Sequence, residues 1–258
     1  MNSQARPLPL TADDWGMSPG INAAILEMAQ RGLIQQVSIL AGSPFVKHGL
    51  DELLKVPHLK FGLHFNLTLF PPLFEEQQDA FSPFMDPASF HYKPFWKLRM
   101  IWANPLGRST KIALATDACK GQLEKLRTLK VPVSYMDGHQ EVHTLPGLFP
   151  AIASELKKWG VLEILVTNPW GKLFSGKFFQ ARCAFKTARL ARNLGFAVRK
   201  VYQPSLTQLR RPSRSQNKTF VVRPSVSNDL ENYGIRDRYR QGRVMEYEAL
   251  NQLAQSLN

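Results

Sequence analysis

The chain has 258 residues, 44% of them hydrophobic, so it can bury one substantial core, and α/β barrels of this length commonly form a single domain. No stretch approaches the roughly 18 consecutive apolar residues of a membrane span, and the polar residues 1–7 do not resemble a secretory signal. We therefore expect a cytoplasmic protein. The two cysteines, Cys119 and Cys183, are too few for a disulfide framework and lack the spacing of metal ligands.

The net charge of +13 is concentrated in one segment. Residues 164–228 contain 13 Lys or Arg and no Asp or Glu, while acidic and basic residues balance in the rest of the chain. A local basic surface of this kind indicates an anionic partner rather than a generally basic protein.

Two adjacent carboxylates, Asp13 and Asp14, end the first predicted strand. Gly16, Ser18 and Pro19 follow them, as in a tight turn that leads into a helix. Parallel α/β folds place their chemistry at such strand ends, where one carboxylate can bind a cation while its neighbour acts as a base. The alternative is an Asp-rich turn that only caps the helix.

Alternating strand and helix patterns follow this turn. Ser18 and Pro19 begin a helix that ends near Arg31, and residues 36–41 and 49–55 predict a strand and a short helix. Residues 60–68 predict a further strand that places His64 and Asn66 on the same side. A single His in a strand is often a satisfied core residue, but its alternation with Asn66 favours a site.

Residues 70–108 interrupt this alternation with several prolines and many aromatic residues. A connection of this length within a compact domain is usually a lid or a binding loop. Residues 90–102 interleave rings and cations, which could stack on sugars, rest at a lipid interface or simply cover the core.

The next loop is rich in titratable groups. A helix at 111–130 and a strand at 132–136 lead into Asp137, His139, Glu141 and His143. Such groups are costly to place together unless a ligand or metal satisfies them, so the loop predicts a site. A helix at 150–159 and a strand at 162–167 continue the α/β pattern.

Residues 177–192 predict a basic helix. Its cations at 182, 186, 189 and 192 share one face, which could bind anionic lipid headgroups or a polyanion, or could simply be solvated. A loop at 203–218, a strand at 219–224 and a helix at 244–257 complete the chain. No glycine-rich phosphate loop follows a strand and Gly-x-Ser-x-Gly is absent, which argues against nucleotide enzymes and serine hydrolases.

Three motifs in this order resemble those of the YdjC-like carbohydrate deacetylases. They are Thr-Ala-Asp-Asp-Trp-Gly-Met-Ser-Pro around Asp13, Gly-Leu-His-Phe-Asn-Leu-Thr around His64, and Asp-Gly-His-Gln-Glu-Val-His around His139. Arg243-x-x-Glu246-x-Glu248 is similar to the C-terminal signature of that family. The resemblance runs through most of the chain.

The resemblance implies a single domain over residues 1–258, with a distorted, incomplete (β/α) barrel related to polysaccharide deacetylases, a lid-like insertion at about 70–108 and the basic segment at 164–228. It further implies that Asp14, His64 and His139 bind a divalent metal and that Asp13 is the general base of a hydrolase that removes acetyl groups from N-acetylated amino sugars. Magnesium is favoured by resemblance, although Zn, Mn and Co suit the same mixed ligands. Four residues would bind substrate: Trp15, Asn66, His143 and Arg223.

Two departures from the family pattern bear on this activity. The family usually has His where this chain has Glu141, and it has His-Pro-Gly where this chain has Arg223-Pro224-Ser225. Arginine cannot donate a proton to a leaving amine near pH 7 because its pKa is above about 12. The alternatives are therefore an active deacetylase and a catalytically degenerate sugar-binding relative.

The partner predictions follow from the same features. The substrate would be an N-acetylated sugar or glycan, with an anionic or lipid-linked glycan favoured by the basic segment. Peripheral contact with an anionic membrane at its inner face and a homodimer are further alternatives, and no nucleic acid is expected.

Overall fold

The computed structural model describes residues 9–70, 73, 108–174, 177–210, 218–235, 237 and 239–257. The predicted insertion at about 70–108 lies almost entirely outside these residues. Among the described residues, none of the helices is long and apolar enough to cross a membrane.

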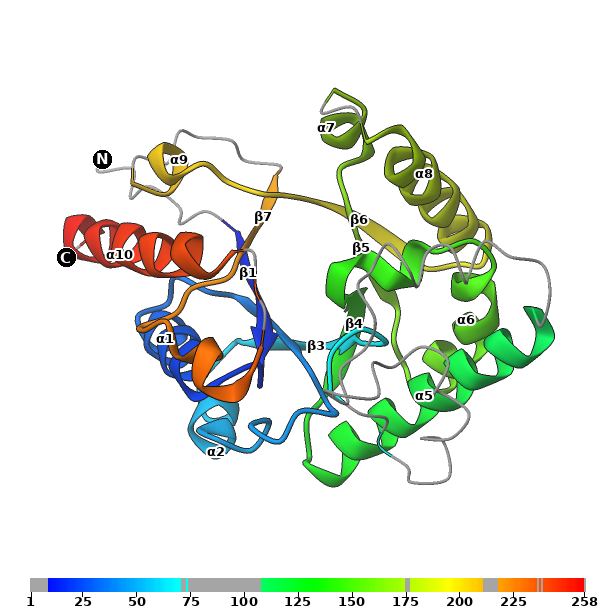
Figure 1. Cartoon of the computed structure of the whole chain (residues 1–258), viewed down its shortest axis with the longest axis horizontal. Coiled ribbons are helices and arrows are strands. Elements are labelled where there is room, and N and C mark those ends of the chain that lie inside the picture. The colour runs from blue at the N-terminus through cyan, green and yellow to red at the C-terminus, as the bar shows by residue number, and fades with distance from the viewer. Residues whose placement is uncertain are drawn as a thin grey trace. The chain divides into compact units, whose positions relative to one another are not determined.

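In the described part of the chain, seven strands alternate with helices (Figure 1). Their order around a closed barrel is the order of the sequence. This architecture confirms the predicted (β/α) barrel, which has one strand fewer than the eight of a complete barrel. The strands are β1 (Leu10–Trp15), β2 (Gln36–Ile39), β3 (Lys60–Phe65), β4 (Val133–Gly138), β5 (Glu163–Thr167), β6 (Ala197–Tyr202) and β7 (Thr219–Val222).

The chain divides into two compact units, and the first contains residues 1–39, 44–61 and 200–258. Here β1 pairs in parallel with β2 and β7, and the end of β6 pairs with β7. Helix α10 packs against α9 and α1. The helices of this unit are α1 (Pro19–Gln30), α2 (Leu50–Leu54), α9 (Leu206–Arg210), the 3₁₀ helix η3 (Asp229–Tyr233) and α10 (Arg240–Leu257).

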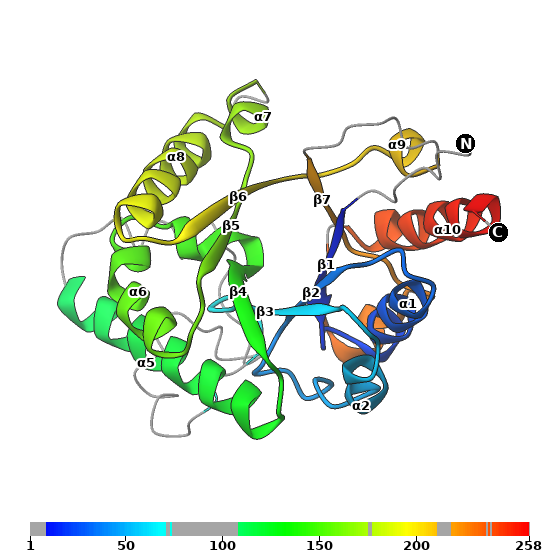
Figure 2. The same cartoon turned by 180° about the vertical axis from the view of Figure 1, so that it is seen from behind.

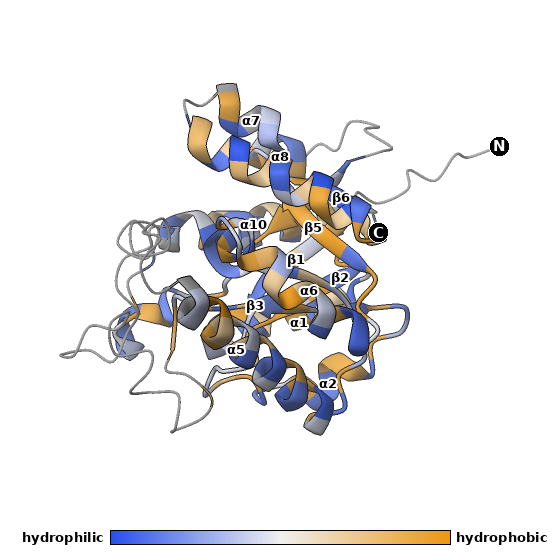
Figure 3. Cartoon of the chain, turned by 90° about the vertical axis from the view of Figure 1, so that its right-hand side faces the viewer, coloured by the Kyte–Doolittle hydropathy of each residue, from blue (hydrophilic) through white to orange (hydrophobic). Residues whose placement is uncertain are grey.

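The second unit contains residues 40–43 and 62–199. Strands β4 and β5 are parallel neighbours, α5 packs on α6, and α8 packs on β5 (Figure 2). Strand β5 is apolar over much of its length (Figure 3). The helices of this unit are α5 (Arg108–Thr128), the 3₁₀ helix η2 (His139–Thr144), α6 (Leu148–Lys158), α7 (Pro169–Phe174) and α8 (Phe178–Asn193).

Local sequence signals explain how α1 begins. Ser18 is the N-cap, its Oγ accepting a hydrogen bond from the Ile21 amide over 3.2 Å, and Pro19 occupies the first helical position, as predicted. Asp229 of η3 accepts hydrogen bonds from the Ser18 hydroxyl and the Gly20 amide, each over 2.7 Å. The start of α1 is therefore tied to the segment that follows β7.

Strand β6 was absent from the sequence-based prediction. Two adjacent charged residues, Arg199 and Lys200, interrupt its apolar pattern, and Arg199 forms an ion pair with Glu163 of β5 over 2.7 Å. The predicted loop at 203–218 contains the short helix α9, and its residues 211–217 lie outside the described residues.

Candidate functional site

Asp13 and Asp14 lie on β1, and both are buried. The register of β1 against β2 shifts between Ala12 and Trp15, and Asp14 has a positive φ of 69°. A regular strand would send neighbouring side chains to opposite faces, and a bulge of this kind redirects one of them. Both carboxylates consequently approach the guanidinium of Arg223.

Arg223 follows β7 and pairs with the acids of β1. Its Nη2 donates to Asp13 Oδ2 over 3.0 Å, and its Nε lies 3.9 Å from Asp14 Oδ2. The guanidinium also lies over the ring of Tyr239. Burial opposes its charge, but Asp13 and Asp14 outweigh that cost and raise the pKa of Arg223, so the side chain stays cationic.

Arg243 of α10 holds Asp14 from another side. Its Nη2 donates to Asp14 Oδ2 over 2.7 Å and its Nε donates to Asp237 Oδ2 over 2.5 Å. Burial works against this charge too, and the two carboxylates raise the pKa of Arg243 above its usual value. We name Asp13, Asp14, Arg223 and Arg243 the carboxylate centre.

The second unit carries a pair of imidazoles. His64 Nδ1 lies 2.7 Å from Asp137 Oδ1, and His64 Nε2 lies 3.3 Å from His139 Nδ1. The two rings meet edge to face, and all three side chains are buried. Because the carboxylate of Asp137 accepts the proton on Nδ1, His64 presents the lone pair of Nε2. We name His64, Asp137 and His139 the imidazole centre.

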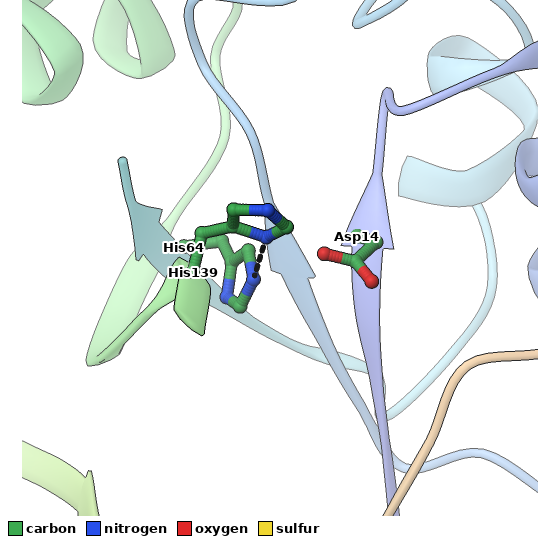
Figure 4. A group of neighbouring side chains, drawn as sticks. All are labelled: Asp14, His64 and His139. Atoms are coloured by element: carbon green, nitrogen blue, oxygen red, sulfur yellow. Dashed lines mark hydrogen bonds between the residues drawn. The ribbon is translucent and has the colours of Figure 1, made fainter. Parts of the chain in front are cut away.

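Figure 4 draws Asp14, His64 and His139, each a buried side chain that offers one candidate ligand atom for a metal ion. The dashed line in Figure 4 joins the two imidazoles at His139 Nδ1 and His64 Nε2. Asp13 and Asp137 are further buried candidate ligands. Asp137 bonds to the His64 ring itself, which is the contact of a residue that orients a ligand.

His143 lies on the same 3₁₀ helix as His139. Its side chain is buried, and neither ring nitrogen has a hydrogen-bond partner among the described residues. Burial lowers the pKa of His143 to about 4, so the ring is neutral near pH 7. A Cβ built on Gly138 would lie 2.5 Å from His143 Nδ1, which shows how closely the ring approaches this backbone.

Glu141 pairs with Lys172 of α7. Burial disfavours its charge, but Lys172 outweighs burial and keeps the pKa of Glu141 below its usual value. Gln140 and Glu141 both have positive φ angles, of 50° and 61°, where L residues are uncommon. Neither Glu141 nor His143 therefore holds a proton that is readily donated near neutral pH.

Two side chains that were predicted to contact substrate, those of Trp15 and Asn66, form hydrogen bonds within the protein. Trp15 is fully buried and donates from Nε1 to the Val46 carbonyl over 3.0 Å. Asn66 Oδ1 accepts hydrogen bonds from the amides of Thr68 and Leu69 and so shapes the turn after β3. Substrate binding by these side chains stays a prediction.

Sequence reasoning did not identify the roles of Asp137 and Arg243. In the sequence Asp137 is one of several titratable groups in its loop, and its position near the end of β4, two residues before His139, is the available signal. Arg243 was noted as part of a C-terminal motif, and no spacing rule could pair it with Asp14, 229 residues away.

Comparison with known proteins extends these observations. Carbohydrate deacetylases of Vibrio cholerae and Vibrio vulnificus are 29% and 30% identical over 152 and 146 residues, 58% and 55% of this chain. The chain spans about half the length of these curated relatives, 55% and 51%. A crystal structure of a putative cellobiose-phosphate cleavage protein from Enterococcus faecalis matches 97% of this chain and 93% of its own, with a TM-score of 0.69 and 16% identity, which concerns the fold alone. Residues 7–257 match the family described as YdjC-like protein, and the chain therefore belongs to that family.

Proposed function

We propose that the protein is a metal-dependent hydrolase that removes an acetyl group from an N-acetylated amino sugar or glycan. The observation that carries this proposal is the imidazole centre, in which Asp137 fixes one imidazole and His139 lies 3.3 Å from its other nitrogen. The deacetylase relatives in Vibrio support the same reaction class.

The donor set fits a divalent cation. Asp14, His64 and His139 would supply one carboxylate oxygen and two imidazole nitrogens, a set that leaves positions for water and substrate. Asp137 holds the tautomer of His64 that exposes Nε2. Mixed oxygen and nitrogen ligands suit Mg, Mn, Co or Zn, with Mg favoured by family resemblance.

A cation at this site would polarise the acetamide carbonyl and acidify a water molecule. Asp13 is the base that takes the proton of that water as its oxygen adds to the carbonyl carbon. The carbon–nitrogen bond then breaks, releasing acetate and an amine that needs one proton. Arg243 keeps Asp14 oriented throughout, because its guanidinium also bonds to Asp237 and cannot rotate freely.

The proton for the amine comes from Asp13 in this proposal. Arg223 stays protonated, Glu141 is ionised by its pairing with Lys172, and His143 is neutral. The proton that Asp13 has just accepted can return to the nitrogen, which balances the reaction without a separate acid.

Arg223 replaces the family's usual histidine and is the residue that we expect to set substrate preference. Its side chain retains 24% of its exposure while it is paired with Asp13. It would contact an anionic group of a glycan, with His143 supporting the loop and Asn66 the turn. A homodimer stays a separate prediction.

The ion pair of Arg223 and Asp13 also favours the alternative function, sugar or anionic-glycan binding without turnover. A base that is neutralised by a guanidinium is weaker, because the positive charge stabilises the carboxylate. Whether Asp13 accepts a proton during the reaction or stays paired with Arg223 decides between deacetylation and binding without turnover.

Acetate release from N-acetylglucosamine oligomers, with and without added Mg, Mn, Co or Zn, tests the proposal. We expect metal-stimulated release, its loss in Asp13→Asn, and retention of metal binding by that variant in calorimetry. Binding of the oligomers with no release under any metal would establish the alternative function instead.

A further inference from the structure

Helix α8 buries small side chains and exposes two of its phenylalanines. The positions that it buries are small: Ala181, Cys183, Ala184, Thr187, Ala188 and Ala191. Phe178 and Phe185 are instead 65% and 38% exposed. An ordinary surface helix buries its large apolar residues and exposes polar ones. The two phenylalanines therefore form an apolar surface that the described residues leave exposed.

The exposed face of α8 also carries a cluster of cations. Arg182, Lys186, Arg189 and Arg192 are exposed, and their spacing by three or four residues places them on one face together with the two phenylalanines. Figure 3 shows hydrophilic and hydrophobic residues interleaved along this helix. Since residues 164–228 contain no Asp or Glu, this part of the chain supplies no acidic residue to neutralise them.

A third aromatic ring extends this surface onto α7. Trp170 is 50% exposed, and its ring meets that of Phe185 edge to face with centroids 5.3 Å apart. We name Trp170, Phe178, Phe185 and the four cations of α8 the aromatic-basic face. Rings of this amphipathic kind rest at the headgroup level of a bilayer while cations reach its phosphates.

We propose that the aromatic-basic face docks on the surface of an anionic phospholipid membrane. Charge complementarity favours an anionic surface, and the exposed rings favour a bilayer over a purely polar polyanion, because they gain by leaving water. The convex face of a helix can lie on a flat surface, whereas single-stranded nucleic acids are usually followed by a groove.

The helix that carries this face packs, through its other side, against the 3₁₀ helix of the imidazole centre in the same unit. Helix α8 packs against η2, which carries His139 and His143, and Lys172 of α7 pairs with Glu141 of η2. Together with the proposed deacetylase function, on which this step rests, membrane docking narrows the class of substrate. The substrate would be an acetylated sugar that a lipid carries and presents at the membrane surface.

The test is sedimentation of the full chain with vesicles of phosphatidylcholine, alone or with phosphatidylglycerol. The unaltered protein should bind the anionic vesicles and not the neutral ones. The triple variant Arg182→Glu/Lys186→Glu/Arg189→Glu should bind about a hundredfold more weakly or worse, since each cation lost near an anionic surface weakens binding about fivefold and the new carboxylates are repelled. The matched control reverses three exposed lysines of the other unit, Lys47→Glu/Lys55→Glu/Lys60→Glu, and should bind within about threefold of the unaltered protein.

A second variant, Trp170→Ser/Phe178→Ser, keeps every cation and tests the rings. It should bind at least tenfold more weakly at a salt concentration that screens surface charges. Equal loss in the lysine control, no binding by the unaltered protein, or binding that is unaffected by the ring substitutions would each overturn the proposal. Preference for RNA over anionic vesicles at equal salt would also overturn it.

Vesicle binding needs no turnover, so its outcome is independent of the deacetylase assay. If the protein binds vesicles but releases no acetate from soluble oligomers, the proposed function fails and docking stands. If it deacetylates soluble oligomers but ignores anionic vesicles, docking fails and the proposed function stands.

Discussion

Arg243 donates from Nη2 to Asp14 Oδ2 over 2.7 Å, and each side chain is only 2% exposed. A buried ion pair of this kind contributes little net stability while it is intact, but removing one partner leaves an uncompensated charge in the core. The second contact of Arg243, to Asp237, adds another carboxylate that would lose its partner.

Arg243→Gln should therefore destabilise the protein by about 3–5 kcal/mol, because Asp14 and Asp237 would stay buried without a cation. Urea denaturation measures this change. Lys158→Gln is the control, because Lys158 pairs with Glu155 at the surface and should cost at most about 1 kcal/mol. If Arg243→Gln loses no more unfolding free energy than this control, the ion pair of Arg243 with Asp14 does not organise the carboxylate centre.

Asp137→Asn should weaken metal binding by about 10- to 100-fold. An amide in place of the carboxylate no longer fixes the tautomer of His64 that exposes Nε2. Calorimetric titration with Zn and Mn gives the affinity, and the exposed Asp117→Asn on α5 serves as the control. Unchanged affinity in Asp137→Asn would remove His64 from the proposed ligands.

Local patterns in the sequence predicted the alternation of strands and helices, the helix start at Ser18 and the acids and histidines near strand ends, whereas the barrel was implied by the family resemblance. It could not predict the contacts of Arg243, since a pair separated by 229 residues depends on how α10 is placed against β1. It also could not predict the bulge at Asp14, where the register against β2 shifts and both acids approach Arg223. Strand β6 could not be predicted because Arg199 and Lys200 interrupt its apolar pattern, and the ion pair of Arg199 with Glu163 of β5 is not visible in the sequence.

Arg223→His should preserve or increase deacetylation of a neutral acetylated sugar. The substitution removes the permanent charge that lies 3.0 Å from Asp13 and restores a side chain able to donate a proton near pH 7. Affinity for an anionic glycan should fall in the same variant. Initial rates on neutral and anionic oligomers test both effects, and no change in either would separate Arg223 from substrate recognition.

Gly138→Ala should destabilise the protein by about 1–3 kcal/mol through overpacking, since the new methyl group would lie 2.5 Å from His143 Nδ1. The backbone at Gly138 is extended, with φ −147° and ψ 134°, so the cost comes from the contact rather than from the dihedral angles. Gly242→Ala on α10 is the matched control, because nothing lies within 4 Å of its added Cβ. The double variant Gly138→Ala/His143→Ala should lose less stability than the sum of the losses in the two single variants. If the two losses simply add, the methyl group at position 138 does not press on His143.

The buried ring of His143 should make folding stability depend on pH. Its pKa is about 4 in the folded protein and about 6.5 in an unfolded chain, so the unfolded state binds more protons between these values. The stabilising contribution is complete above about pH 6.5 and is lost as the pH falls towards 4, by up to about 3 kcal/mol. His143→Leu should remove this part of the pH dependence, whereas His58→Asn at an exposed position should leave it intact. Urea denaturation of the three proteins between pH 4 and 7.5 provides the comparison, and parallel curves for the unaltered protein and His143→Leu would show that the ring is accessible to protons in the folded state.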